Sequence, residues 1–282
     1  MPELPEIWNL ARQMDQTLRG KSISQVEVRQ EKCLNRPLEE FRVLLEGKRL
    51  KDCQAHGKWV TTTLAPEGYF LLSLGMGGSL LYHPAPAASL PEKYQVRLGF
   101  EDNSALTVGF WWFGYAHAVE RKEEHPMTAN LGLDPLDDCS FTWEAFQSLL
   151  SGKKGAIKPL LMDQHAVAGI GNVYIQDILF CSRLHPNRKI PTISEEQRQT
   201  LYRVIGENLR QAAEMGGLAY EEDLFGAHGQ FKDFLVGYRE GKPCPECGAA
   251  IQKIKTGSTS TFICPNCQSE TSSFSLPKNR SR

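Results

Sequence analysis

The spacing of hydrophobic and polar positions changes along the chain and divides it into two halves. Between about residues 22 and 120, short runs alternate apolar with polar residues or are rich in β-branched and aromatic residues; examples are SISQVEVRQ, WVTTTL, YFLLSL and QVRLGF. Turn signals such as PEG and EDN separate these runs at intervals of about ten residues. The pattern predicts an antiparallel β-sandwich or barrel.

Helical spacing of apolar residues occurs on both sides of this strand-rich region. The segment EIWNLARQMDQTLRGK, which stops at Gly20, predicts one amphipathic helix. After the stretch NLGLDPLDDCS, short helices are predicted for TWEAFQSLLSG, AIKPLLMDQ and GNVYIQDILFCSR. The clearest helix begins at a capping box of Ser194 and Gln197 and ends at a glycine pair. The predicted fold class is α+β, with a domain boundary near residue 135.

The eight cysteines form two groups with different expected roles. Four are isolated in apolar or mixed settings, where reduced, buried thiols are expected: Cys33, Cys53, Cys139 and Cys181. The other four have the spacing C-x2-C-x16-C-x2-C, which supplies four thiolates to a tetrahedral Zn²⁺: Cys244, Cys247, Cys264 and Cys267. Disulfides or redox dithiols are the alternative, and a reducing cytosol disfavours them. A structural zinc would stabilise residues 236–270, which are too few to fold around a hydrophobic core.

Composition and charge limit the setting and the partner. The 282-residue chain has no run near the roughly 18 consecutive apolar residues of a membrane span, and its acidic start lacks the features of a secretory signal. We therefore expect a cytoplasmic protein with no membrane partner. A net charge of −1 argues mildly against nucleic acid. However, residues 1–150 carry 15 basic and 20 acidic side chains, whereas residues 151–282 carry 17 and 13, so an anionic partner would dock on the second half.

Three further features each allow two interpretations. In MPELPEI, the prolines keep a terminus extended, or Pro2 presents a secondary amine once the initiator methionine is removed. In AGIGNVY, the glycines before Asn172 form an ordinary turn between helices, or they present backbone N–H groups to a phosphate. Lys58 in AHGKWV is either a solvated surface charge or a functional cation.

Together these motifs resemble the formamidopyrimidine-DNA glycosylase and endonuclease VIII family of base-excision repair enzymes. The resemblance covers nearly the whole chain, through PELPE, HGKW, LGMGGSL, LGLDPL, KPLLMDQ to GIGNVY, GYREGKPCPECG and the four-cysteine finger. It implies a catalytic β-sandwich domain over residues 1–134 and a helix–two-turn–helix DNA-binding domain over 135–235. A zinc finger at 236–270 and a flexible basic tail at 271–282 would follow.

The resemblance also implies an activity and its catalytic residues. The expected function is a bacterial, monomeric, bifunctional DNA glycosylase and AP lyase that acts at the nucleoid on DNA containing damaged bases or abasic sites. Pro2 would attack C1′ and form a Schiff base, and Glu3 would serve as the adjacent acid and base. Lys58 would contact a phosphate near the lesion. An α-amino group has a pKa near ~8, so a useful fraction of the Pro2 amine would be unprotonated at neutral pH.

Six residues correspond to the family's DNA-contacting positions. Glu6 would orient the amino-terminal end, and Asn172, with Lys158 as a neighbour, would bind the phosphates that flank the extruded nucleotide. Met76 and Phe113 would fill the space that this nucleotide leaves, and Trp111 occupies the position of the third gap-filling residue. Neither the PELPE variant nor the long segment GLAYEEDLFGAHGQF identifies the damaged base.

Two positions depart from the family pattern. In GFWWFG, Gly109 and Trp111 replace the family's aspartate and arginine, and an indole has only one donor with which to read the base opposite a lesion. We therefore expect weaker opposite-base discrimination, or action on single-stranded or distorted DNA. Thr259 replaces an arginine that grips the lesion phosphate in the family, so weaker DNA affinity or altered elimination is expected.

Two other functions are compatible with parts of the sequence. A DNA-binding protein of the same fold, with little or no glycosylase activity, would recognise abasic or distorted DNA; Trp111 and Thr259 favour it, and Pro2 and Glu3 oppose it. A zinc-ribbon module of transcription or translation would explain residues 236–270 but not the amino terminus.

Overall fold

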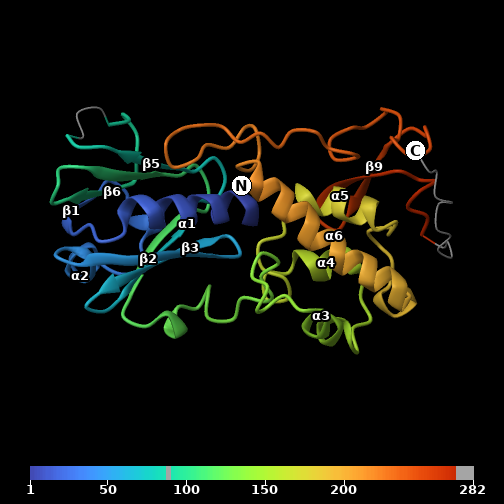
Figure 1. The fold of residues 1–282 in the computed structure, drawn as a ribbon, viewed down its shortest axis with the longest axis horizontal. Coiled ribbons are helices and arrows are strands. Elements are labelled where there is room, and N and C mark those ends of the chain that lie inside the picture. Colours follow the sequence, from blue (N-terminus) through green and yellow to red (C-terminus); the bar gives the residue numbers. More distant parts are fainter. Residues whose placement is uncertain (87–89, 271–282) are drawn as a thin grey trace. The chain divides into compact units, whose positions relative to one another are not determined.

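The computed structural model of the chain describes residues 1–86 and 90–270, and the predicted basic tail at 271–282 lies outside them. The chain forms two compact units (Figure 1). The amino-terminal unit combines Met1–Asp134 with Arg210–Lys232, and the carboxy-terminal unit combines Pro135–Leu209 with the segment that begins at Asp233. No helix within the described ranges has both the length and the apolar character that a membrane span requires.

Two four-stranded antiparallel sheets form the amino-terminal unit. The first has the order β1-β6-β7-β5 and the second the order β2-β3-β4-β8. The strands of the first are β1 (Ile23–Val28), β5 (Ser79–His83), β6 (Val96–Phe100) and β7 (Ala105–Gly109). The strands of the second are β2 (Arg49–His56), β3 (Trp59–Ala65), β4 (Tyr69–Ser73) and β8 (Tyr115–Val119). The predicted sandwich is confirmed.

The core of this unit lies between the sheets and against helix α1 (Leu4–Leu18). The apolar residues of α1 recur at helical spacing, as predicted, and are almost fully buried: Ile7, Leu10, Met14 and Leu18. Figure 1 shows α1 alongside β2 and β3. In the second sheet, alternate side chains such as Val60 and Phe70 face this core, while Trp59 and Leu71 point to the opposite face. The helix and both sheets therefore share one hydrophobic core.

A helix interrupts the region for which we predicted only strands. Helix α2 (Leu38–Leu45) begins after Pro37 and buries Phe41 and Leu45, while Val43 remains 75% exposed. Apolar positions four residues apart lie on one helical face, and proline is favourable where a helix begins. The helical spacing of these apolar residues covers only about two turns, and the strand-like segments on both sides hid this spacing in the sequence. Short 3₁₀ turns occur at η1 (Glu31–Cys33), η2 (Lys122–Glu124) and η3 (Ile190–Thr192).

A buried histidine pair lies on the outer face of the second sheet. His117 Nδ1 and His125 Nε2 are 2.8 Å apart, and the other ring nitrogen of His125 is 2.8 Å from Thr128 Oγ1. The ring of Trp59 packs against both imidazoles. Burial lowers the pKa of His117 to about 4, with the positive charge of His125 as the second cause, and burial lowers the pKa of His125 as well. Both rings are therefore neutral at physiological pH.

Acidification is expected to destabilise this unit through the histidine pair. The pKa of His117 is about 4 in the folded state and near 6.5 in an unfolded chain, so the unfolded state takes up protons first as the pH falls. The neutral His117 ring contributes roughly 3 kcal/mol to the free energy of unfolding. This contribution is fully present above pH 6.5 and is lost as the pH falls from 6.5 to 4. Urea unfolding of wild type and His117→Gln between pH 7.5 and 5 would measure it. If the free energy of unfolding fell equally with pH in both proteins, His117 would not be the cause of the acid destabilisation.

The carboxy-terminal unit consists of helices and a β-hairpin. Its elements are α3 (Trp143–Leu150), α4 (Ile157–Met162), α5 (Tyr174–Cys181), most of α6 (Glu195–Glu214), β9 (Gln252–Thr256) and β10 (Thr259–Ile263). The capping box predicted for α6 is present: Ser194 N donates to Gln197 Oε1 at 3.1 Å, and Gln197 N donates to Ser194 Oγ at 3.3 Å. Gly216 and Gly217 end the helix with positive φ angles. The predicted α+β class is therefore confirmed.

The acidic side chain Asp177 ties α5 to the segment that precedes the hairpin. Its carboxylate accepts hydrogen bonds from the backbone N–H groups of Leu235, Val236 and Gly237 at 2.7, 2.9 and 3.0 Å. The side chain is only 3% exposed, so three donors compensate for the loss of water. These bonds position the chain that leads into the four-cysteine segment.

Candidate active site and nucleic-acid interface

The amino-terminal residues are held by a reciprocal cap on α1. Glu6 Oε2 accepts a hydrogen bond from Glu3 N at 2.8 Å, and the Glu3 side chain accepts one from the backbone N–H of Glu6. Glu6 Oε1 also accepts a hydrogen bond from Leu218 N at 3.0 Å. Both glutamates are almost fully buried, and Pro2 is buried beside them. The PELPE motif thus acts locally as a capping box that fixes the positions of Pro2 and Glu3.

The segment after α6 approaches this cap closely, and glycine permits the approach. Gly217 has a φ angle of +86°, and a Cβ atom there would lie 2.7 Å from Glu6 Oε1. Any side chain at this position would push Glu6 away from its bond to the Leu218 N–H. The glycine pair that we predicted as a helix end therefore also makes room for the amino terminus.

Glu221 is a third carboxylate at this site, and no sequence pattern predicts it. The amino group of Met1 lies 3.5 Å from Glu221 Oε1, whose side chain is 12% exposed. Burial raises the pKa of Glu221, the amino group opposes that rise, and the charges of Glu3 and Glu222 add to it. An acidic residue on a loop more than 200 residues away carries no pattern that would link it to the terminus.

Lys58 lies in the two-residue turn of the β2–β3 hairpin, where His56 pairs with Trp59. The turn is tied to the LGLDPL segment: Gly57 N donates to Asp134 Oδ2 at 3.3 Å, and a ring nitrogen of His56 lies 3.1 Å from Gly132 O. The HGKW and LGLDPL motifs, far apart in the sequence, therefore meet. Together they fix the backbone that carries Lys58.

The predicted gap-filling residues lie on two loops that pair with each other. Met76 N donates to Trp112 O at 2.8 Å, and Met76 O accepts from the N–H groups of Trp111 and Trp112. Exposed fractions are 44% for Met76, 83% for Trp111, 62% for Trp112 and 65% for Phe113. Trp111 is therefore not a core residue. Trp112 was missed, although the sequence FWWF places it between two residues that we had singled out.

Glycine allows these two loops to approach closely. A Cβ atom on Gly75, whose φ angle is +58°, would lie 2.1 Å from Trp112 O. At Gly109, where the family has aspartate, a Cβ atom would lie 2.8 Å from Ser79 Oγ, so a side chain there would displace Ser79. The two loops and the strand that leads into the aromatic one are thus packed for glycine at Gly75 and Gly109.

Lys158 and Asn172 are neighbours in the carboxy-terminal unit, and Lys158 is only 2% exposed. Lys158 Nζ lies 2.8 Å from Asn172 Oδ1 and within 3.1 Å of the hydroxyl oxygens of Thr256, Thr259 and Thr261. Asn172 Nδ2 donates to Ser260 O at 3.1 Å. Burial lowers the pKa of Lys158 to about 8. The threonines were not predicted to take part in this way, because only the hairpin pairing aligns them.

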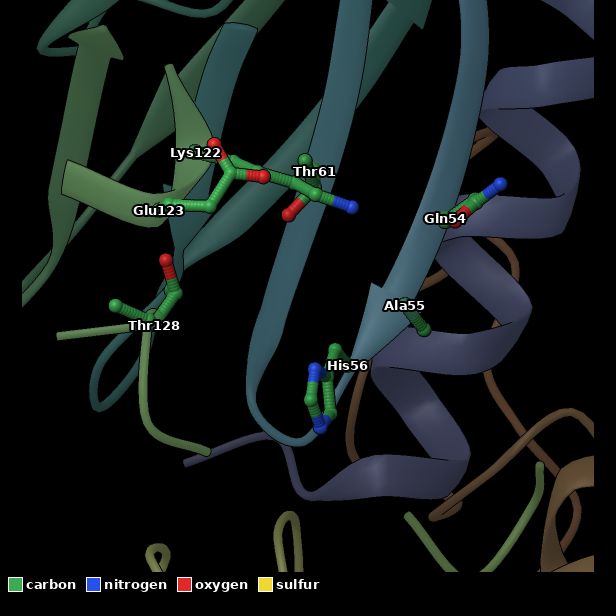
Figure 2. A pocket seen from close by; sticks show the side chains of 8 residues that line it. Gln54, Ala55, His56, Thr61, Lys122, Glu123 and Thr128 are labelled. Atoms are coloured by element: carbon green, nitrogen blue, oxygen red, sulfur yellow. The ribbon is translucent and has the colours of Figure 1, made fainter. Parts of the chain in front are cut away.

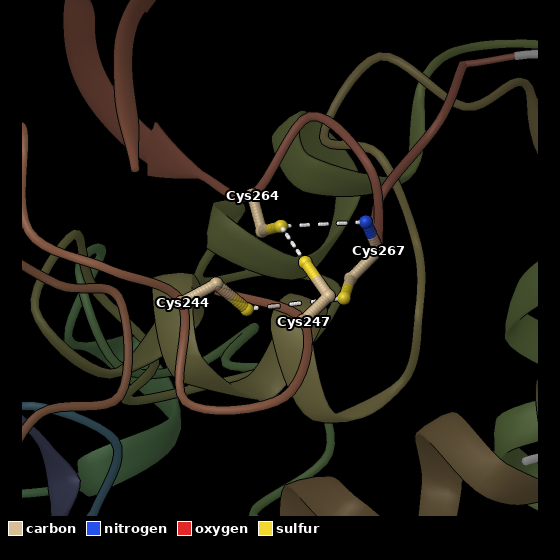
Figure 3. Close-up of side chains that lie close together, drawn as sticks. All are labelled: Cys244, Cys247, Cys264 and Cys267. Carbon is tan, nitrogen blue, oxygen red and sulfur yellow. Dashed lines mark hydrogen bonds between the residues drawn. The ribbon is translucent and has the colours of Figure 1, made fainter. Parts of the chain in front are cut away.

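The four predicted zinc ligands converge in space. Their sulfur atoms lie within 4.8 Å of one another, and Figure 3 shows them facing a common centre. Two of the S–S distances are 3.8 and 3.4 Å, far from the ~2 Å of a disulfide and near the ~3.8 Å edge of a tetrahedral zinc–thiolate site. The ligands flank β9 and β10, so the hairpin and the metal site form one finger.

A pocket on the outer face of the amino-terminal unit lies apart from the predicted site residues. Strands β2 and β3 and the segment after β8 line it, with His56, Thr61, Lys122, Glu123 and Thr128 among its residues (Figure 2). None of the residues expected to act in catalysis or to contact DNA lines this pocket. In the amino-terminal unit the candidate functional residues lie in the cap and in the two loops that carry Met76 and Trp111. In the carboxy-terminal unit they lie around Lys158 and in the finger.

Three family models match the chain in order. They describe the formamidopyrimidine-DNA glycosylase N-terminal domain at residues 1–109, the formamidopyrimidine-DNA glycosylase H2TH domain at 131–223, and a zinc finger found in FPG and IleRS at 241–269. The chain belongs to the formamidopyrimidine-DNA glycosylase family. The zinc-finger match and the cysteine geometry agree that four cysteines are positioned to bind a zinc ion.

Relatives of the formamidopyrimidine-DNA glycosylase family match along their full length. The enzyme of Gluconobacter oxydans is 35% identical over 284 residues, which cover 95% of this chain and 100% of the relative. That of Pelotomaculum thermopropionicum is 34% identical, with 95% and 99% covered. Solved structures of the Lactococcus lactis Fpg with DNA that contains N7-benzyl-Fapy-dG or an abasic site are 26% identical. Each has a TM-score of 0.86 and covers 95% of this chain, and the match spans 100% and 99% of those chains.

Proposed function

We propose that this DNA glycosylase of the formamidopyrimidine family is bifunctional, with Pro2 as nucleophile and AP lyase activity through a Schiff base. The cap that holds Glu3 and Glu6 beside Pro2 carries the proposal, because it fixes an amine and a carboxyl group next to each other. The solved relatives bind DNA with a damaged base or an abasic site, and we propose the same substrates here. Residues 1–134 would serve as the catalytic domain, 135–235 as the DNA-binding domain and 236–270 as the finger.

The proposed chemistry begins once Met1 is removed. The unprotonated Pro2 nitrogen attacks C1′, the bond from C1′ to the base breaks, and the base leaves with the bonding electrons and the proton that the Pro2 nitrogen loses. Glu3 protonates the sugar oxygen as the ring opens, which leaves a cationic iminium. The iminium accepts electrons when a proton leaves C2′, so the 3′ phosphate can depart by β-elimination. Water then releases the amine from the product.

The remaining predicted residues would hold the DNA. Lys58, on its fixed hairpin turn, would contact a phosphate near the lesion, and Asn172 would bind the phosphates that flank the extruded nucleotide. Met76 and Phe113 would enter the duplex, which their exposure permits. Glu6 would act indirectly, because both of its carboxylate oxygens already accept hydrogen bonds from backbone N–H groups.

Borohydride trapping tests the proposed activity directly. The protein is incubated with abasic-site DNA and reduced, and a covalent adduct that joins the DNA to the amino-terminal peptide is expected. Mass spectrometry of that peptide would show both the removal of Met1 and the attachment at Pro2. DNA binding without any adduct would instead favour a protein that recognises abasic DNA without acting on it, an alternative that Trp111 and Thr259 keep open.

Discrimination among the bases opposite the lesion is expected to be weak because Trp111 occupies the position where the family has an arginine. Trp111→Arg should increase the spread of excision rates among the four opposite bases by about tenfold, since a bidentate arginine contact discriminates by roughly 1–3 kcal/mol. Single-turnover excision rates from four duplexes that differ only in the base opposite the lesion would measure this spread. Val43→Arg, at another exposed apolar position, is the control and should change nothing. Strong discrimination by the wild-type protein would contradict the proposal.

A further inference from the structure

Glu221 is a largely buried carboxylate beside the amino terminus, and the chemistry proposed above gives it no role. Its Oε1 atom lies 3.5 Å from the amino nitrogen of Met1, and its side chain is 12% exposed. Pro2 follows Met1 and becomes the first residue once Met1 is removed. The carboxylate therefore lies at the end of the chain where the proposed nucleophile would be.

Two hydrogen bonds fix the backbone of Glu221 in its loop. Glu221 N donates to Leu218 O at 3.0 Å, and Glu221 O accepts from Gly229 N at 3.3 Å. The two sides of the loop approach closely at the second contact, because a Cβ atom on Gly229 would lie 2.2 Å from Gly217 O. The loop thus holds the backbone from which the Glu221 side chain extends.

Glu6 joins this loop to the amino-terminal cap. One of its carboxylate oxygens accepts a hydrogen bond from Glu3 N at 2.8 Å, and the other accepts one from Leu218 N at 3.0 Å. Leu218 O accepts the bond from Glu221 N. Hydrogen bonds therefore connect the backbone of Glu3 to that of Glu221, and every residue in the series belongs to the amino-terminal unit.

The surroundings of Glu221 favour proton exchange. Burial raises the pKa of Glu221, the amino group opposes that rise, and the negative charges of Glu3 and Glu222 add to it. A carboxyl group whose pKa is raised towards the working pH is an effective proton acceptor and donor. The other titratable side chains on the loop and at the start of α1 are Glu3, Glu6, Tyr220, Glu222, Asp223 and His228.

We propose that Glu221 is the proton carrier of the reaction, which accepts the proton that the Pro2 nitrogen loses and passes it to the departing base. The inference rests on the proposed function for its nucleophile and adds the group that moves this proton. The Glu221 carboxylate faces the first nitrogen of the chain. Consecutive backbone nitrogens are at most ~4 Å apart, so removal of Met1 leaves the new terminal amine within reach of a rotated Glu221 side chain.

Bonds and protons balance in this step. As the Pro2 nitrogen bonds to C1′, the bond from C1′ to the base breaks and the base takes its electrons. The nitrogen then carries a positive charge and one proton, which moves to the Glu221 carboxylate. The resulting carboxylic acid gives this proton to the base anion and becomes a carboxylate again. Glu3 protonates the sugar oxygen in the ring opening that follows, so the two carboxyl groups have separate tasks.

Adduct formation on abasic DNA isolates this proton transfer, because the base has already left. The Pro2 nitrogen still loses a proton when it adds to C1′, and Glu221 would pass that proton to the aldehyde oxygen. Glu221→Gln should therefore slow the formation of the borohydride-trapped adduct at saturating DNA by about 100-fold, the lower end of general acid–base contributions. Glu3→Gln should still form this adduct.

The pH dependence of adduct formation separates proton transfer from a structural role. The rate depends on unprotonated amine and therefore rises with pH until the amine has lost its proton. A carboxylate beside an amine stabilises the ammonium form, so this rise occurs at a higher pH when Glu221 is present. In Glu221→Gln the rise should move to lower pH, while the plateau stays about 100-fold below that of wild type.

Two further variants serve as controls. Glu221→Asp keeps a carboxylate on a shorter side chain, so it should keep the pH of the wild-type rise and recover part of the rate. Glu222→Gln removes an exposed acidic side chain from the same loop and should change neither. Urea unfolding, and binding to a duplex with a tetrahydrofuran abasic analogue, would show that each variant folds and holds DNA.

The possible outcomes distinguish this inference from the proposed function. An unchanged plateau in Glu221→Gln, or a rise at the same pH as in wild type, would overturn the role of Glu221 alone. Wild-type protein that binds abasic DNA but forms no adduct would instead contradict the proposed function. A shifted rise with a lower plateau, partly restored in Glu221→Asp, would support both.

Discussion

Glu3→Gln is expected to slow release of a damaged base by roughly 100- to 10,000-fold, the usual contribution of general acid–base catalysis. The glutamine carbonyl can still accept the hydrogen bond that the Glu3 side chain accepts at the start of α1, so the helix and the position of Pro2 should be retained. What the amide cannot do is give a proton to the sugar oxygen. Single-turnover excision of a damaged base would measure the loss.

The same experiment separates the proposed roles of the first two residues. On abasic DNA the base has already left, so Glu3→Gln should still form a borohydride-trapped adduct. Pro2→Gly should weaken trapping itself, because it replaces the constrained secondary amine with a flexible primary one. Glu39→Gln, a substitution at an exposed glutamate on α2, is the control. Normal turnover in both variants would show that the roles proposed for Pro2 and Glu3 are wrong.

Loss of the metal should unfold the finger and remove most of the DNA affinity. The finger shares a small hydrophobic cluster with α5, formed by residues such as Phe180, Val236, Ile251 and Phe262. Structural zinc in such modules contributes about 10–16 kcal/mol of apparent binding free energy, far more than this cluster can supply. Cys264→Ser should therefore lose zinc and hydrogen-exchange protection across β9 and β10. Because these strands carry three of the oxygens around Lys158, Kd should rise at least tenfold.

Cys181→Ser provides a matched control for the zinc prediction. Cys181 packs against the same hydrophobic cluster, but its thiol is not one of the four that converge. Elemental analysis should find one zinc per chain in Cys181→Ser and less in Cys264→Ser. If Cys264→Ser retained both the metal and the exchange protection of the hairpin, the ligand assignment would be incorrect.

Features that depend on near neighbours in the chain can be predicted from the amino-acid sequence. Strand alternation, the apolar stripe of α1 and the capping box at Ser194 and Gln197 all arise from interactions within a few residues, so their periods can be read directly. The zinc ligands were identifiable for a related reason. Two CxxC pairs specify a tetrahedral site through ligand type and short spacing, whatever surrounds them. The short helix α2 was missed because its signal covers only two turns.

Contacts between residues far apart in the chain become visible only once the chain is folded. Glu6 meets Leu218 across 212 positions, and Lys158 meets Thr261 across 103, through contacts that no local period encodes. Lysine and glutamate are usually exposed, so no local pattern predicts that Lys158 is buried or that Glu221 lies beside the amino terminus. Conversely, a run such as FWWF is ordinarily core, but after the buried Phe110 the pairing of two glycine-lined loops leaves Trp111, Trp112 and Phe113 exposed. Burial is set by packing between segments far apart in the chain, and local patterns do not report it.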